Sequence, residues 1–237
     1  MKKIVFSFLG VIMLGLSSCI KSGDNIQDFP PVPAFVDVDF IYGRVTLNTP
    51  YGPMVTTELQ NALDLPYGVP VLASFSINYD QQTSNEYMVV YNVQYYVIAQ
   101  AYAYPATGGE STDDFTLPIE SMTYLGPVGS SFFFGFTHKD VAKGDTFLYE
   151  MTYDGEKSGG YPVVTIRAQK SDSGSQNSAC AFDMSSFLWD NMGDNNKVNF
   201  KVQYKTGVND KGEEQFATLK DQNGNDLVIP YSVASGE

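Results

Sequence analysis

The sequence predicts an all-β protein that consists of a small barrel followed by a second β-domain. Beyond residue 34, no window keeps apolar residues at the three-to-four spacing of a helix over any length. Short runs of alternating apolar and polar residues recur instead, separated by Gly, Pro, Asn and Asp. Hydrophobic residues make up 43% and aromatic residues 14% of the 237 residues, which is enough to fill a core.

The first residues have the pattern of a secretory signal. Lys2 and Lys3 precede an apolar run over 4–16, which is shorter than the roughly 20 residues of a membrane-spanning helix but suits a signal peptide. The run ends in Leu16-Ser17-Ser18-Cys19, which resembles the lipobox of bacterial lipoproteins. We therefore expect residues 1–18 to be a signal peptide and Cys19 to carry lipid. The alternative is an ordinary cleaved signal that happens to end at a Cys.

Residues 19–34 are predicted to be a tether. Polar residues come first and Phe29-Pro30-Pro31-Val32-Pro33 follows, a composition that favours extended polyproline II structure. Ile20 follows the Cys where an enterobacterial inner-membrane signal would have Asp, so we expect an outer-membrane lipoprotein of the cell envelope. Only Asp24 and Asp28 lie near as acidic residues, and both a periplasm-facing and a surface-exposed orientation stay open.

Residues 35–108 are predicted to form a barrel of the OB type. Alternating residues over 36–42 change phase near Gly43, which indicates a β-bulge. A further strand is expected over 69–79. The run over 86–104 is too long for one strand, so it should bend or serve two sheet regions. Four or five strands with a bulged first strand suit a small closed barrel.

Residues 109–237 are predicted to form an antiparallel β-sandwich. Candidate strands follow one another at short spacing, and Lys211-Gly212 and Asn223-Gly224 are typical of hairpin turns. The expected strands are Phe115–Leu125, Ser131–Thr137, Thr146–Tyr153, Val163–Gln169, Ala179–Met184, Val198–Tyr204, Gln215–Leu219 and Leu227–Val233.

The layout as a whole resembles that of the NigD-like lipoproteins. The lipobox, the proline-rich segment, the stretches at 43–52 and 71–79, and Tyr-Met-Val-Val-Tyr-Asn-Val at 87–93 carry the resemblance. It implies an OB-like N-terminal domain followed by an all-β C-terminal domain. The family has no settled activity, so the resemblance transfers architecture rather than function.

The charge of the chain argues against nucleic acid as a partner. Lys and Arg number 14 and Asp and Glu 27; without Lys2 and Lys3 the mature chain has 12 against 27, a net charge of −15. Binding to nucleic acid or to an anionic lipid surface requires a basic patch. We therefore expect attachment to the membrane through the N-terminal lipid alone.

The sequence contains no recognisable catalytic or metal-binding motif, and we predict no enzyme, cofactor or metal. His138 is the single histidine, which excludes a multi-His metal site. Cys180, in an apolar strand-like context, is expected to be a buried core residue. The acidic pairs Asp37/Asp39, Asp113-Asp114 and Glu213-Glu214 are expected to be solvated. Residues 221–226 resemble a calcium loop, but Gly224 comes one position early and Ser232 replaces the twelfth-position Glu.

Aromatic residues are the remaining clue to function. Tyr96, Tyr102, Tyr104 and Trp189 are candidates for contact with a ligand or partner, because exposed aromatic rings stack on sugars and anchor protein interfaces. The plainer alternative is that they cover the contact between the domains. We expect a non-catalytic module that binds a glycan or another envelope protein. A carboxylate-based hydrolase and a structural or assembly subunit that pairs through an edge strand are the alternatives.

Overall fold

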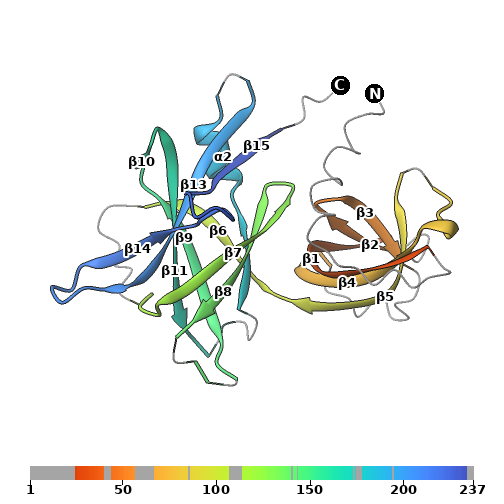
Figure 1. Cartoon of the computed structure of the whole chain (residues 1–237), viewed down its shortest axis with the longest axis horizontal. Coiled ribbons are helices and arrows are strands. Elements are labelled where there is room, and N and C mark those ends of the chain that lie inside the picture. The colour runs from red at the N-terminus through yellow and green to blue at the C-terminus, as the bar shows by residue number, and fades with distance from the viewer. Residues whose placement is uncertain are drawn as a thin grey trace.

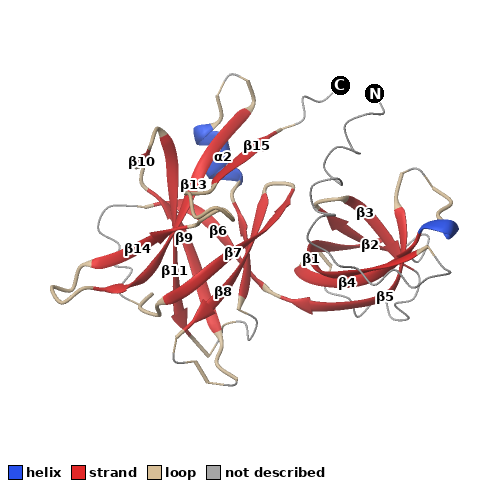
Figure 2. Ribbon diagram, viewed as in Figure 1, coloured by secondary structure: helices blue, strands red, loops and turns tan. Residues whose placement is uncertain are grey.

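The computed structural model confirms an all-β protein with two domains side by side (Figure 1). In the described part of the chain, helical structure is limited to short elements (Figure 2). The structure describes residues 25–39, 44–56, 67–84, 86–106, 114–139, 141–142, 144–172, 174, 178–193 and 195–233.

The first domain is a closed five-stranded barrel in the order β1-β2-β3-β5-β4, as predicted for the OB type. Neighbouring strands are antiparallel except β3 and β5, which are parallel. Alternate residues of each strand point inward, so the barrel encloses a core of small aliphatic side chains around Phe75. The strands are β1 (Ile26–Asp39), β2 (Arg44–Thr49), β3 (Gly52–Thr56), β4 (Pro70–Asn78) and β5 (Met88–Val97), and the 3-10 helix η2 (Tyr79–Gln81) follows β4.

The barrel begins earlier in the chain than predicted. Residues 26–34 were expected to belong to the tether but form the first half of β1, which pairs with β4 from Ile26 onward. The register shifts between Phe29 and Val32, so Pro30 and Pro31 occupy a bulge, where the missing N–H breaks no ladder hydrogen bond. Phe29 then stacks on Phe75 at 5.4 Å. The bulge predicted at Gly43 lies outside the described residues.

The second domain is one strongly curled sheet of ten strands. Its main order is β14-β13-β11-β9-β6-β12-β8-β7, with β10 beside β11 and β15 beside β13. All eight strands expected in this region are present. The elements are β6 (Ala99–Pro105), β7 (Ile119–Val128), β8 (Ser131–His138), β9 (Phe147–Tyr153), β10 (Lys157–Ser158), β11 (Tyr161–Lys170), β12 (Ala179–Asp183), α2 (Ser185–Asn191), β13 (Lys197–Val208), β14 (Glu214–Thr218) and β15 (Val228–Ser232).

The expectation of an antiparallel sandwich is corrected in two respects. The strands form one continuous sheet rather than two, and three pairs are parallel: β6 with β9, β6 with β12 and β11 with β13. The two halves of the sheet still face each other across one core, since Phe132 of β8 packs on Phe200 of β13 and Tyr231 of β15. The alternation of apolar and polar residues along a strand predicts which face is buried, but it does not specify which strands pair.

The domain boundary lies at Ile98 rather than at residue 108. β5 belongs to the barrel and β6 to the curled sheet, with Ile98 alone between them. The prediction that the long run over 86–104 serves two sheet regions is therefore confirmed. The run connects the two domains directly, without a separate linker.

An apolar seam joins the two domains. Ile98, Phe133, Ala179 and Ala181 are buried there, and the partly buried residues Phe35, Leu72, Leu125 and Val128 pack against them. The rings of Phe35 and Phe133 meet edge to face at 5.5 Å between centroids. Adjacent residues such as Cys180 and Phe182 point into the sheet core instead. The barrel therefore covers part of the outer face of the curled sheet, opposite its core.

Candidate binding groove

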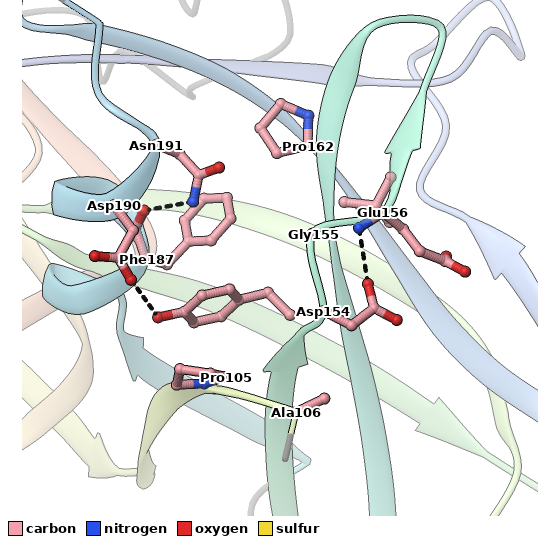
Figure 3. Close-up of a pocket in the computed structure, with 11 residues that line it drawn as sticks. Pro105, Ala106, Asp154, Gly155, Glu156, Pro162, Phe187, Asp190 and Asn191 are labelled. Atoms are coloured by element: carbon pink, nitrogen blue, oxygen red, sulfur yellow. Dashed lines mark hydrogen bonds between the residues drawn. The ribbon is translucent and has the colours of Figure 1, made fainter. Parts of the chain in front are cut away.

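A groove lies beside α2, near the C-terminal ends of β6 and β9 and the start of β11 (Figure 3). Its volume is about 300 Å³, at the lower end of the range of small-ligand sites. Side chains from four separate stretches of the chain meet there. The lining residues are Pro105, Ala106, Tyr153, Asp154, Gly155, Glu156, Pro162, Val163, Phe187, Asp190 and Asn191.

The helical wall of the groove is held by the sheet core. Asp183, at the end of β12, accepts hydrogen bonds from the backbone N–H and the hydroxyl of Ser185, which begins α2. Phe187 is 1% exposed, and its ring meets those of Tyr153 and Phe200 edge to face. A seven-residue helix is not stable by itself, so this packing fixes α2 in place.

The opposite wall is the turn after β9. The backbone N–H of Glu156 donates to the Asp154 carboxylate at 2.9 Å, and Gly155 between them has φ +85°, which a side chain would strain. Val163 N–H donates to the Glu156 carbonyl at 3.1 Å, which closes the turn onto β11. Backbone hydrogen bonds thus set the shape of this wall.

A hydrogen bond joins the two sides of the groove. The Tyr153 hydroxyl, from β9, donates to Asp190 Oδ2, from α2, at 3.0 Å (Figure 3). Burial, together with this bond and the negative charge of Asp190, raises the pKa of Tyr153 to about 12. Tyr153 therefore stays protonated at neutral pH and orients the Asp190 carboxylate.

The lining combines carboxylates with apolar rings. The acidic residues Asp154, Glu156 and Asp190 line the groove, and no lysine or arginine is among its lining residues. The sign of this charge disfavours phosphate or carboxylate ligands. Neutral compounds that carry both hydroxyl donors and apolar faces suit such a surface.

The four aromatic candidates from the sequence are exposed, as predicted, but none lines the groove. Tyr96, Tyr102 and Tyr104 are 54%, 66% and 40% exposed, and Trp189 is 83% exposed. Ala99, Ala101 and Ala103 of β6 pack on the sheet core, so Tyr102 and Tyr104, which alternate with them, lie on the outer face of the sheet. Tyr96 lies in the barrel strand β5.

Trp189 lies apart from both the groove and the tyrosines. Phe187, Asp190 and Asn191 face the groove, and a helix turns by about 100° per residue, so Trp189 projects from the other side of α2. The helix itself packs on the inner face of the sheet, opposite Tyr102 and Tyr104. The structure therefore does not bring the four candidates together. Their role in binding stays a prediction.

Tyr104 belongs to a charged cluster on the outer face of the sheet. Its hydroxyl donates to Glu150 Oε2 at 2.6 Å. Arg167 lies between Glu150, at 3.8 Å, and Glu214, at 2.9 Å, and Lys205 contacts Glu214 at 2.7 Å. Burial is the largest influence on Glu150 and raises its pKa. The two acids and two bases balance one another, so this cluster is explained as a structural element.

The only histidine and the cysteine of the second domain are core residues. His138 is the last residue of β8, stacks on Phe147 at 4.8 Å, and makes a 3.0 Å hydrogen bond with the Tyr149 hydroxyl. It is therefore a buried strand residue with a structural hydrogen bond. Cys180 is fully buried, as predicted, and burial raises the pKa of its thiol.

Of the other acidic candidates, Asp37, Asp114 and Glu213 are exposed, as predicted, and the rest that are described make structural contacts. Asp221 accepts hydrogen bonds from the backbone N–H groups of Asn223 and Asn225, as in a tight turn, and Asp226 pairs with Lys201 and Lys220. Glu214 is in the charged cluster. Asp113 and the side chain of Asp39 lie outside the described residues. Within the described part of the chain, no group of three or more acidic, His or Cys side chains is placed to hold a metal ion.

The membrane anchor predicted at Cys19 also lies outside the described residues. In the parts of the chain that the structure describes, no helix has the length and apolar character needed to cross a bilayer.

Comparisons with known proteins show the fold. No protein-family model matches the chain, and no curated protein is similar in sequence. An uncharacterized protein from Parabacteroides merdae superposes with a TM-score of 0.63 at 17% identity, over 85% of this chain and 97% of that one. A proposed lipoprotein from Bacteroides fragilis superposes with a TM-score of 0.52 at 13% identity, over 89% and 100%. A NigD-like immunity protein from Bacteroides caccae is also found, with a TM-score of 0.46 at 14% identity, over 86% and 96%.

The first two likenesses extend over both domains of this chain, since each covers more than four fifths of it. At such low identity they carry over the arrangement of strands and no activity. The chain therefore has the two-domain all-β fold that its resemblance to the NigD-like lipoproteins implied, and it shares that fold with proteins of the Bacteroides and Parabacteroides genera.

Proposed function

We propose that this protein is an envelope lipoprotein, anchored by lipid at Cys19, that binds a neutral glycan in the groove beside α2 without catalysing a reaction on it. The observation that carries the proposal is the lining of the groove. The Asp190 carboxylate and the Asn191 amide can accept hydrogen bonds from sugar hydroxyls, while Tyr153 and two prolines offer apolar surface.

Two further features support a binding role. The groove is preformed, because the Tyr153–Asp190 hydrogen bond and the turn at Gly155 hold both walls in place. Ordering these side chains on binding would then cost little free energy. Lipid attachment would keep the protein at the envelope, where polysaccharides are abundant ligands.

Binding can be tested with the purified mature protein, screened on an array of neutral and anionic oligosaccharides and then by calorimetry. We expect neutral glycans to bind and anionic ones to fail. Asp190→Ala removes a charged acceptor, a loss of about 2 kcal/mol, and should weaken binding about thirty-fold. Trp189→Ala is the matched control on the other side of the same helix and should leave the affinity unchanged.

Two results would contradict this function. Release of new reducing ends from a bound glycan, lost in Asp190→Asn, would identify a hydrolase and remove the non-catalytic role. Capture of an envelope protein by wild type but not by a Tyr96/Tyr102/Trp189 triple alanine variant, with no glycan bound, would place recognition on the exposed aromatic residues instead.

Pairing through an edge strand has less support. Among the edge strands, β7 and β15 contain Pro127 and Pro230, which remove backbone donors, and β7 also has two register irregularities; β14, at the other end of the sheet, contains no proline. Prolines and bulges are features that protect edges from pairing with other chains. An assembly subunit would be indicated by concentration-dependent polymers of the mature protein.

A further inference from the structure

We propose that the η2 end of the barrel rests against the membrane surface and that the curled sheet, with its groove, projects away from the bilayer. This orientation rests on the lipid anchor at Cys19 in the proposed function. It follows from where the chain enters the barrel and from the short length of chain between that point and the anchor.

The chain enters the barrel at the end that carries η2. Ile26 pairs with Asn78, the last residue of β4, and Tyr79 N–H donates to the Asn25 carbonyl at 2.9 Å. The Asn25 side chain donates to Asp80 at 3.2 Å. The start of β1 is therefore fixed against η2.

Few residues separate this point from the anchor. Residues 20–24 lie between Cys19 and Asn25. A chain spans at most about 3.6 Å per residue, so these six steps reach at most about 22 Å however they are arranged. The tether expected from the sequence was three times as long, because residues 26–34 were assigned to it rather than to β1. The η2 end of the barrel thus stays within about 22 Å of Cys19.

The groove lies far from this end. β5 begins at Met88 beside η2, and the same run of chain passes through Ile98 into β6 and reaches the groove at Pro105. At about 3.3 Å per residue, this run of chain spans at most about 55 Å. Figure 1 shows the η2 end of the barrel on the side turned away from the curled sheet, along the longest axis of the molecule, and Figure 2 shows η2 itself there in blue. The seam between the domains holds this arrangement.

The η2 end suits contact with neutral lipid headgroups. Its exposed side chains are polar or acidic: Asp80, Gln81, Thr83 and Glu86. Residues 79–84 and 86–87 contain no exposed large hydrophobic residue and no lysine or arginine, but the exposed Arg44 of β2 lies over the Tyr87 ring at 5.8 Å. Apolar residues would be needed to insert into the bilayer and basic ones to bind anionic lipids. With one arginine among several acidic and polar side chains, we expect this surface to rest on a zwitterionic headgroup layer without entering it.

Energy transfer from single-site labels to the bilayer tests the orientation. The lipidated protein would carry Thr83→Cys at the η2 end, Glu156→Cys at the groove or Lys211→Cys at the β13–β14 turn, and be labelled with a maleimide donor. Buried Cys180 should not react under native conditions. Each protein would be reconstituted in phosphatidylcholine liposomes that contain an acceptor lipid. We expect the highest transfer from position 83, and transfer at least several-fold lower from positions 156 and 211.

Two controls separate the orientation from the anchor. Intact mass must show the acyl chains on the wild-type protein, and Cys19→Ala must fail to float with liposomes; if the wild type lacks lipid, the anchor itself is wrong. Inserting twenty Gly/Ser residues after Asp24 should lower the transfer from position 83, because the tether no longer confines the barrel. Acylated protein with equal transfer from all three positions, or with the highest transfer from position 211, would overturn the orientation.

Discussion

Truncation of Phe133 tests whether the seam makes the two domains one cooperative unit. Phe133 is fully buried between the curled sheet and the barrel, and its ring meets Phe35 edge to face. Truncation of a buried Phe to Ala costs about 3–5 kcal/mol, and an aromatic pair adds about 0.5–1.5 kcal/mol beyond its buried area. We therefore expect Phe133→Ala to lower the free energy of unfolding by about 4 kcal/mol.

A double-mutant cycle with Phe35→Ala isolates the contact across the seam. Urea unfolding followed by circular dichroism would give the four free energies, with a coupling of about 1 kcal/mol between Phe133 and Phe35. Phe134→Ala is the matched control, because Phe134 is equally buried in the same strand but points into the sheet core against Phe182. Phe134→Ala should lower the free energy of unfolding by a similar amount. In the double variant with Phe35→Ala, the two losses should add within about 0.5 kcal/mol.

Either of two results would refute this account of the seam. A loss below about 1 kcal/mol for Phe133→Ala would mean that the position is not packed as described. Additive effects of Phe133→Ala and Phe35→Ala would mean that the barrel and the sheet do not stabilise each other there. Wild type should also show one calorimetric transition rather than two.

The remaining predictions concern buried polar groups. Arg167→Ala leaves Glu150 and Glu214 without their shared partner and should cost about 3 kcal/mol in urea unfolding; a loss below 1 kcal/mol would contradict a structural role for the cluster. Burial lowers the pKa of His138 in the folded protein. As the pH drops below 6.5, His138 is therefore protonated in the unfolded chain before it is protonated in the folded one, and the free energy of unfolding should fall. His138→Phe should flatten this part of the curve. Cys180 should react with a thiol reagent only as fast as the protein unfolds, and rapid native labelling would contradict its burial.

Most of the strands could be predicted from the sequence, because apolar and polar residues that alternate along the chain indicate a strand with one buried face. Val36 and Val38, then Val45 and Leu47, alternate with wetter residues and do line the barrel core. The length of the run over 86–104 was also informative, since no single barrel strand needs so many residues.

The pairing of strands could not be predicted in the same way. Pro30 and Pro31 looked like a tether because proline usually ends a strand, but a bulge opposite β4 accommodates them. The parallel pairs of β6 arise because β9 and β12 approach it from distant parts of the chain. Alternation carries no information on such long-range neighbours.

The groove was missed for a related reason. Its residues come from four short stretches, and each looks like an ordinary turn or helix end in the sequence. Asp154-Gly155 is a turn signal, and Asp190 and Asn191 fall in a polar stretch between two predicted strands. Their meeting depends on α2 docking through Phe187 on the sheet core. Exposure of the four aromatic candidates was predictable, but their separation onto different surfaces was not.

Mapping a bound glycan by NMR shows whether the groove beside α2 is the binding site. A neutral oligosaccharide selected on the array would be titrated into isotope-labelled mature protein. We predict saturable shifts at the backbone amides of Ala106, Glu156 and Asn191, which line the groove, and none at Tyr102 on the outer face of the sheet. Shifts confined to Tyr102 and its neighbours, or no shifts with any neutral glycan, would contradict glycan binding in the groove.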